Sequence, residues 1–219
     1  VKGRHLQRTR DINLLAPVAF STISTSAVQA TFFRNPGVQG TPDRPISAFS
    51  KIREFESNAF SDYNALALQV NKRFAKNFQL MASYTWSKVI DNAPDATSVV
   101  DGNAGDEAKQ AQQSFNLLDD KAVGNADVPH RFVTSGVWDL NYFKGVSKPL
   151  GWVVGGWQIS SILQAQVNQP FSLVAGADVN NDSQRNSDRA PGVGRNTFRK
   201  GKFVSLDSRF QKTVNLNEK

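Results

Sequence analysis

Apolar residues occupy alternate positions in two neighbouring stretches of the chain, and this alternation restricts the fold more than any other feature of the sequence. The stretch 61–74 reads SDYNALALQVNKRF, and its apolar positions are Leu66, Leu68, Val70 and Phe74. The stretch 77–91 reads NFQLMASYTWSKVID, where Phe78, Leu80, Ala82, Tyr84 and Trp86 share one parity. Because successive side chains of a β-strand point to opposite faces, each stretch predicts a strand with one apolar face.

The connection between these strands is short, since only Ala75, Lys76 and Asn77 separate the two patterns. Asparagine tolerates the left-handed conformation that tight turns often require, so Asn77 suits a hairpin turn. The sequence therefore predicts a β-hairpin over roughly residues 62–90.

Three later stretches repeat the alternation and predict strands within 130–142, 152–174 and 203–216. The less regular stretch 47–57 predicts extended structure before the hairpin, and residues 1–13 resemble the end of a strand. The polar parity carries the candidates for a water-filled lumen: Gln69, Asn71, Arg73, Gln79, Ser83, Thr85, Gln158, Gln164 and Gln166. The apolar parity carries the candidates for lipid contact and an aromatic belt: Leu66, Leu68, Val70, Phe78, Leu80, Tyr84, Trp86, Trp138 and Trp157.

The connections differ in length, and this difference bears on what the apolar face meets. Those at 75–77 and 143–151 are short or moderate, whereas 91–129 and 175–202 are long and polar. Short turns on one side and long loops on the other are typical of outer-membrane β-barrels, and structureless loops of this length are uncommon in compact soluble domains. We therefore predict an all-β fold, an antiparallel transmembrane β-barrel segment of about six or seven strands. The alternative is a soluble β-sandwich whose apolar face meets a second sheet.

Composition excludes several other classes. The chain has no cysteine, which excludes disulfide frameworks and Cys-based zinc or nucleophile sites. Its net charge of +7 comes from scattered basic residues, with a mild cluster at Arg195, Arg199, Lys200 and Lys202, and we expect solvated charge and no nucleic-acid partner. No stretch approaches the ~18 apolar residues of a transmembrane helix. The chain opens on Val1 without a signal peptide, so we expect a fragment or a processed chain.

Several motifs together resemble the TonB-dependent outer-membrane receptors. The motifs are SYTWSK (83–88), PHRF (129–132) and GGWQ (155–158), followed by the stretch DVNNDSQRNSDRAPGVGRN (178–196). The nearest subgroup is the Oar-like proteins, which carry a carboxypeptidase-regulatory-like domain; Lys2, Gly3, His5 and Leu6 match the end of one of their strands. The resemblance runs from residue 1 to about residue 217 and implies part of a C-terminal barrel, usually 22-stranded.

The resemblance also implies a function and partners for the parent protein. Such receptors take up a scarce nutrient, such as a metal chelate or a glycan, across the outer membrane of Gram-negative bacteria. The expected partners are outer-membrane lipid, an unknown extracellular ligand, the protein's own plug domain and the inner-membrane TonB complex. The plug, the TonB box and the final strands are absent from residues 1–219, so no energy-coupling residue carries over. A passive porin or an adhesin-like barrel is the alternative within this fold.

Candidate chemical sites are few. Neither His5 nor His130 has the convergent partners of a catalytic site, no hydrolase, P-loop or zinc motif is present, and we expect no enzyme activity and no cofactor. Asp178, Asn180 and Asp182 match positions 1, 3 and 5 of a calcium loop, but Ser183 and Arg189 replace the glycine and the final glutamate. We therefore assign no metal site and expect a solvated loop, with calcium binding as the alternative. The acidic residues of the other long loop are also expected to be solvated: Asp101, Asp106, Glu107, Asp119 and Asp120.

Overall fold

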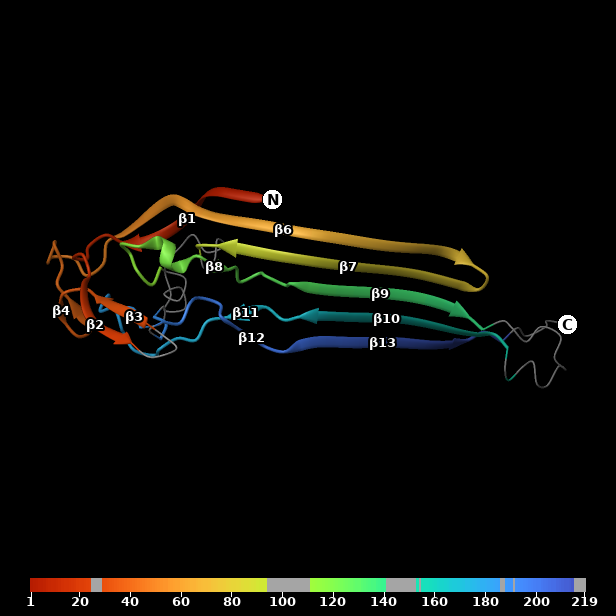
Figure 1. Cartoon of the computed structure of the whole chain (residues 1–219). Coiled ribbons are helices and arrows are strands. Elements are labelled where there is room, and N and C mark those ends of the chain that lie inside the picture. Colours follow the sequence, from red (N-terminus) through yellow and green to blue (C-terminus); the bar gives the residue numbers. More distant parts are fainter. Residues whose placement is uncertain are drawn as a thin grey trace. The chain divides into compact units, whose positions relative to one another are not determined.

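The structure is a computed structural model that describes residues 1–24, 29–93, 111–140, 153, 155–185, 188–190 and 192–214. Antiparallel strands dominate it, as the alternation predicts (Figure 1). The longer strands are β1 (Lys2–Asp11), β2 (Val18–Ser24), β3 (Gln29–Arg34), β6 (Arg53–Ala75), β7 (Phe78–Asp91), β9 (His130–Asp139), β10 (Trp157–Val167) and β13 (Lys202–Lys212). Two-residue strands are β4 (Gly37–Val38), β5 (Thr41–Pro42), β8 (Ala122–Val123), β11 (Pro170–Phe171) and β12 (Phe198–Arg199), and a short 3₁₀ helix spans Leu117–Asp120.

The main sheet has the strand order β1-β6-β7-β9-β10-β13, with β8 paired to β7. This order confirms an antiparallel all-β fold, and its seven strands agree with the expected number. The hairpin between β6 and β7 is confirmed: Lys76 and Asn77 both adopt positive φ, at 54° and 63°, as a tight two-residue turn requires. Among the described residues no helix is long and apolar enough to cross a membrane.

The first strand of the hairpin is longer than predicted, because β6 begins at Arg53 and absorbs part of the stretch expected to be a separate segment. Its first half pairs with β1, from Asp11 opposite Arg53 to Lys2 opposite Asp62. Opposite charges reinforce this pairing, since Arg10 forms ion pairs with Glu54 at 3.2 Å and Glu56 at 2.5 Å. In the sequence, the complementary charges of residues 8–11 and 53–56 could have predicted this pairing.

The chain divides into two compact units. The loop unit comprises Val1–Asn64, Lys88–Asp127 and Gln169–Lys200, and the strand unit comprises Ala65–Ser87, Val128–Asn168 and Gly201–Lys219. Within the loop unit β2 pairs with β3, β4 with β5 and β11 with β12. Within the strand unit β9 lies between β7 and β10, and β13 pairs with β10.

The two units bury different kinds of side chain. Among the described residues of the chain only four apolar residues are buried, namely Leu14, Ala59, Ala93 and Ala111, all in the loop unit. Seventeen polar or charged residues are buried, and all but Ser87 belong to the loop unit. The described residues therefore form no hydrophobic core of the usual soluble kind.

Candidate functional site

The strand unit carries one apolar and one polar face, and the register of its strands creates both. Phe78 lies opposite Trp138, Trp138 opposite Ile159, and Ile159 opposite Phe210. Directly opposed residues in antiparallel strands point to the same side of the sheet. The same register gathers the remaining residues of the apolar face, which include Leu80, Tyr84, Trp86, Phe132, Trp157, Leu163, Val204 and Leu206.

The opposite face of the strand unit gathers the predicted polar candidates of two strands, β7 and β10. Gln79, Ser83 and Thr85 of β7 share this face with Gln158, Gln164 and Gln166 of β10. Asp207 and Arg209 of β13 lie there as well, together with a few apolar residues: Met81, Val133, Val137 and Ile162. An open hollow of about 490 Å³ has Gln79, Ser160, Asp207 and Arg209 in its lining.

The strand β6 carries the remaining candidates of both kinds. Its Gln69, Asn71 and Arg73 alternate with its Leu66, Leu68 and Val70, so the two sets occupy opposite faces of this strand. All six side chains are exposed. Leu68 and Val70 are 54% and 61% exposed, which is unusual for consecutive apolar positions of a strand in a water-soluble domain.

Aromatic rings with polar partners mark the ends of the strands. Beyond the end of β9, the Trp157 indole donates a hydrogen bond to the Val153 carbonyl oxygen at 2.9 Å, and the Lys212 ammonium lies 4.8 Å from the Trp157 ring centre. At the opposite end of the strands Tyr84 stacks on His130, and its hydroxyl lies 2.8 Å from His130 Nδ1. Rings that combine an apolar body with a polar contact suit a boundary between an apolar medium and water.

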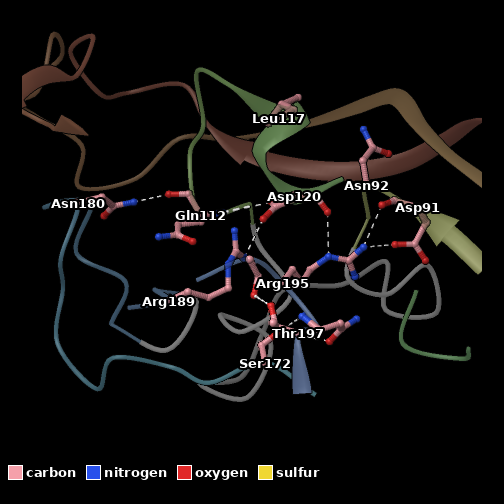
Figure 2. A network of polar contacts seen from close by, with 12 residues as sticks. Asp91, Asn92, Gln112, Leu117, Asp120, Ser172, Asn180, Arg189, Arg195 and Thr197 are labelled. Carbon is pink, nitrogen blue, oxygen red and sulfur yellow. Dashed lines mark hydrogen bonds and ion pairs between the residues drawn. The ribbon is translucent and has the colours of Figure 1, made fainter. Parts of the chain in front are cut away.

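The loop unit contains a network of buried ion pairs, which Figure 2 shows. The Asp120 carboxylate lies between two arginines, 2.9 Å from Arg189 Nη1 and 3.6 Å from Arg8 Nη2. The Arg195 guanidinium forms an ion pair with Asp91 and donates from Nε to the Asp120 carbonyl oxygen at 2.9 Å. These contacts join residues that are distant in the sequence and hold the polar segments of the loop unit together.

This network corrects two predictions about solvated charge. Arg195 is buried, and Arg199 forms an ion pair with the buried Asp127, so these two members of the basic cluster are structural. Asp120 is also buried, whereas Asp119 is exposed as expected, and Asp101, Asp106 and Glu107 lie outside the described residues. Charge type alone does not indicate burial, because the partner of each buried charge comes from a distant segment.

Several described residues of the stretch 178–188 in the loop unit are likewise buried rather than solvated. Asn180, Asn181, Asp182, Gln184 and Asp188 are each at most 3% exposed. The backbone carbonyl oxygen of Asn180 accepts a hydrogen bond from the Asn35 N–H at 2.8 Å, and Asn181 Nδ2 donates to the Asn35 carbonyl oxygen at 3.0 Å. The prediction of a solvated loop is therefore wrong, since the segment packs against the residues around β4 through its own amides.

Comparison with known proteins gives one match. A family model described as an outer membrane beta barrel domain matches residues 1–218. No curated protein and no solved structure matches the chain. The matched model spans almost the whole chain, and a one-sided apolar sheet is the pattern that such a domain requires. The chain therefore belongs to the outer membrane beta barrel domain family, and its antiparallel sheet is a barrel segment of the outer membrane of a Gram-negative bacterium.

Proposed function

We propose that this chain forms part of the barrel wall of a TonB-dependent receptor, through which a scarce nutrient such as a metal chelate or a glycan crosses the outer membrane. The observation that carries the proposal is the separation of faces in the strand unit, where four strands align most of their apolar residues on one side and most of their polar residues on the other. A transmembrane barrel needs this separation, because one face meets lipid and the other meets a wet lumen.

The apolar face is assigned to lipid for an energetic reason. Leu206 and Phe210 are 64% and 68% exposed, and transfer of such a side chain from water to an apolar medium stabilises by about 1.5–3 kcal/mol. Within the described residues the strand unit contains one sheet only, so no second sheet provides that medium as a β-sandwich would. Lipid provides it, and the paired aromatic and lysine side chains at the strand ends then lie at the membrane boundary.

The polar face is assigned to the lumen. Its glutamines and hydroxyl groups offer neutral donors and acceptors, and Asp207 and Arg209 add one charge of each sign beside the hollow. Such a surface can contact water, a passing polar solute or a plug domain that fills the barrel. The resemblance in SYTWSK, PHRF and GGWQ favours the plugged receptor over the open pore. We propose no enzyme activity for the chain, whose sequence contains no hydrolase, P-loop or zinc motif.

Cysteine labelling tests the assignment of the faces. This chain has no cysteine, so Leu206→Cys and Ser205→Cys each introduce one defined position on neighbouring residues. With the intact protein in lipid vesicles, a polarity-sensitive fluorophore at position 206 should be quenched by lipid-borne quenchers, and one at position 205 only by water-soluble quenchers. The pair Leu68→Cys and Gln69→Cys repeats the test on β6. Equal quenching from water at both positions of a pair would contradict a barrel wall.

Conductance tests the energy-coupled function. A plugged receptor in a planar lipid bilayer should show no steady ion current, because its plug fills the lumen, whereas a passive porin should conduct at once. Uptake by living cells should then stop when the inner-membrane energy source is removed. A large steady conductance of the intact protein would favour the porin and reject the receptor.

A further inference from the structure

The buried carboxylates of the loop unit fall into two groups. Asp11, Asp120 and Asp127 each form an ion pair with an arginine. Asp182 and Asp188 are buried as deeply, at 1% and 0% exposure, yet among the described residues no donor bonds the Oδ1 atom of either. An ionised carboxylate is not buried without compensation, so these two oxygens call for a positive partner that the described side chains do not supply.

The fold brings these oxygens to one loop together with two further oxygen-bearing side chains. The Asp178 carboxylate accepts backbone N–H groups from Asp182 at 3.0 Å and Ser183 at 2.8 Å, so the chain curls around it. Asp188 Oδ2 accepts the Val179 and Asn180 N–H groups at 2.5 Å and 3.2 Å, which returns Asp188 to the first turn of the loop. Asn180 Oδ1 accepts the Asp182 N–H at 3.1 Å.

The electrostatics of the loop favour an added positive charge. Burial and then the negative charges of Asp188 and Asp178 raise the pKa of Asp182 to about 8. Burial raises the pKa of Asp188 to about 6, against the effect of two backbone hydrogen bonds. Because the charges of Asp178 and Asp188 both act on Asp182, the three carboxylates lie near one another in this part of the loop unit.

We propose that Asp182 and Asp188 of the loop unit bind a calcium ion through their free Oδ1 atoms, with the side-chain oxygen of Asn180 as a third ligand. Ca²⁺ takes six to eight oxygen ligands, including carboxylates, amide and backbone carbonyls and water, in flexible geometry. Among the described residues no group of three or more His, Cys, Asp or Glu side chains is placed to hold a metal ion, so only two carboxylates serve as ligands here. The amide oxygen of Asn180, backbone carbonyls and water therefore complete the coordination sphere, which is the ligand mixture that calcium accepts and most transition metals do not.

Asp188 is the residue that completes this set. In a 12-residue calcium loop that starts at Asp178, the last ligand falls on Arg189, whose guanidinium instead pairs with Asp120. Asp188 precedes it by one residue, and its Oδ1 atom is buried without a hydrogen-bond partner. The site is therefore not the helix–loop–helix type, and its last ligand is set by the fold of the segment rather than by the usual spacing.

Neighbouring contacts hold the loop ready for an ion. The Gly40 N–H donates to Asn181 Oδ1 at 2.7 Å, and Lys51 Nζ donates to the Ser183 carbonyl oxygen at 3.2 Å. The Asp188 carbonyl oxygen accepts the Ala175 N–H at 2.7 Å. Because these contacts come from β4–β5, from the segment before β6 and from the segment after β11, calcium at this loop would fasten several polar segments of the loop unit at once.

Calcium titration of the intact protein tests the proposal. The protein is refolded into detergent micelles without lipopolysaccharide, treated with EDTA, dialysed and titrated calorimetrically with CaCl₂ and separately with MgCl₂. We expect one Ca²⁺ per protein with a dissociation constant of about 10⁻³ M or lower, the range of extracellular calcium modules, and weaker binding of Mg²⁺. Calcium should also raise the thermal unfolding temperature.

Matched variants locate the ion. Asp182→Asn and Asp188→Asn should each weaken calcium binding at least about tenfold, because each removes a charged ligand. Asp43→Asn makes the same chemical change at an exposed carboxylate of the loop unit and should bind calcium as the parent does.

Two results would overturn the proposal. The first is a parent protein that shows neither heat nor a change in unfolding temperature at about 10 mM Ca²⁺, above the range of the weakest loop sites. The second is undiminished calcium binding in the folded variants at positions 182 and 188, which would place the ion elsewhere. The parent titration alone decides the first point, so the proposal does not depend on any variant folding.

Discussion

The loop unit and the strand unit place their side chains in opposite ways. The loop unit buries Arg8, Asp120 and Asn181, whereas the strand unit exposes Leu206 and Phe210 on one face. Each arrangement suits a different solvent. In water, a segment with few apolar residues is stabilised by ion pairs and by hydrogen bonds that satisfy its buried polar groups. In lipid, hydrogen bonds between neighbouring strands satisfy the backbone N–H and C=O groups, and apolar side chains face outward. The two patterns of burial agree with our proposal that the apolar face of the strand unit meets lipid, while the loop unit buries polar groups as a water-solvated segment does.

The largest effect should come from removal of a buried charge in the loop unit. Arg195→Ala would leave Asp91 without its partner and the carbonyl oxygens of Asp91 and Asp120 without their donor. Breaking a buried ion pair costs about 3–5 kcal/mol, and we expect faster proteolysis of the loop unit and a lower free energy of unfolding. Arg10→Ala, at a surface ion pair, should cost only about 0–1 kcal/mol. Similar losses for both variants would show that the network is not buried in solution.

A charge on the apolar face of the strand unit should have the next largest effect. Leu206→Arg would place a guanidinium in lipid, at a cost of about 2–4 kcal/mol near the middle of the membrane. Ser205→Arg places the same group one residue earlier, on the polar face, where water reaches it. Equilibrium unfolding of the two variants in lipid vesicles compares the faces directly. Equal destabilisation would remove the distinction between the lipid face and the lumen face.

A smaller effect is expected at the glycine that precedes β10. Gly156 adopts φ +73°, and a Cβ there would press against the Thr213 carbonyl oxygen, so Gly156→Ala should cost about 1–3 kcal/mol through backbone strain. Gly201→Ala is the matched control, because nothing lies near its Cβ position and its φ is not positive. The fraction of protein that refolds into micelles and its urea midpoint measure both variants. A neutral Gly156→Ala would mean that the GGWQ glycine has no conformational role.

The smallest effect should come from the aromatic pair of the strand unit. Tyr84→Phe keeps the ring and removes the hydroxyl that lies 2.8 Å from His130 Nδ1. A single hydrogen bond contributes about 0.5–1.5 kcal/mol, and because this pair is exposed we expect the lower end of that range. Urea unfolding of Tyr84→Phe, His130→Ala and the double variant gives the coupling between the two residues. Additive losses would show that the two rings act independently.

The hairpin of β6 and β7 and the parity of β7, β9, β10 and β13 could be predicted from the sequence because both depend on local geometry. The alternation of side chains is a property of the extended backbone, so it is the same whichever strand pairs with it. The start of β6 at Arg53 could not be predicted in this way, because β1 supplies the pairing that extends it. The family match to residues 1–218 confirms the outer-membrane location that the loop asymmetry and the motifs indicated.

The candidate sites were only partly predictable. Asp178, Asn180 and Asp182 stand out by their spacing, but Asp188 does not fit the standard calcium template, and its place beside them depends on backbone hydrogen bonds from Val179 and Asn180. The sequence predicted Arg195 to be a solvated member of a basic cluster. In the structure it is buried and forms an ion pair with Asp91, which lies 104 residues earlier in the chain. Local sequence carries no signal for a partner at that distance.

The sequence by itself determined that this protein has strands with two unlike faces, a tight turn at Asn77 and long polar connections, because side-chain alternation and turn chemistry act over a few residues. Only the tertiary structure decided which charges are buried, which arginine pairs with which aspartate, and that Asp182 and Asp188 keep unpaired oxygens in one loop. The physical reason is that the cost of burying a charge depends on its surroundings in space, and those surroundings come from segments far apart along the chain.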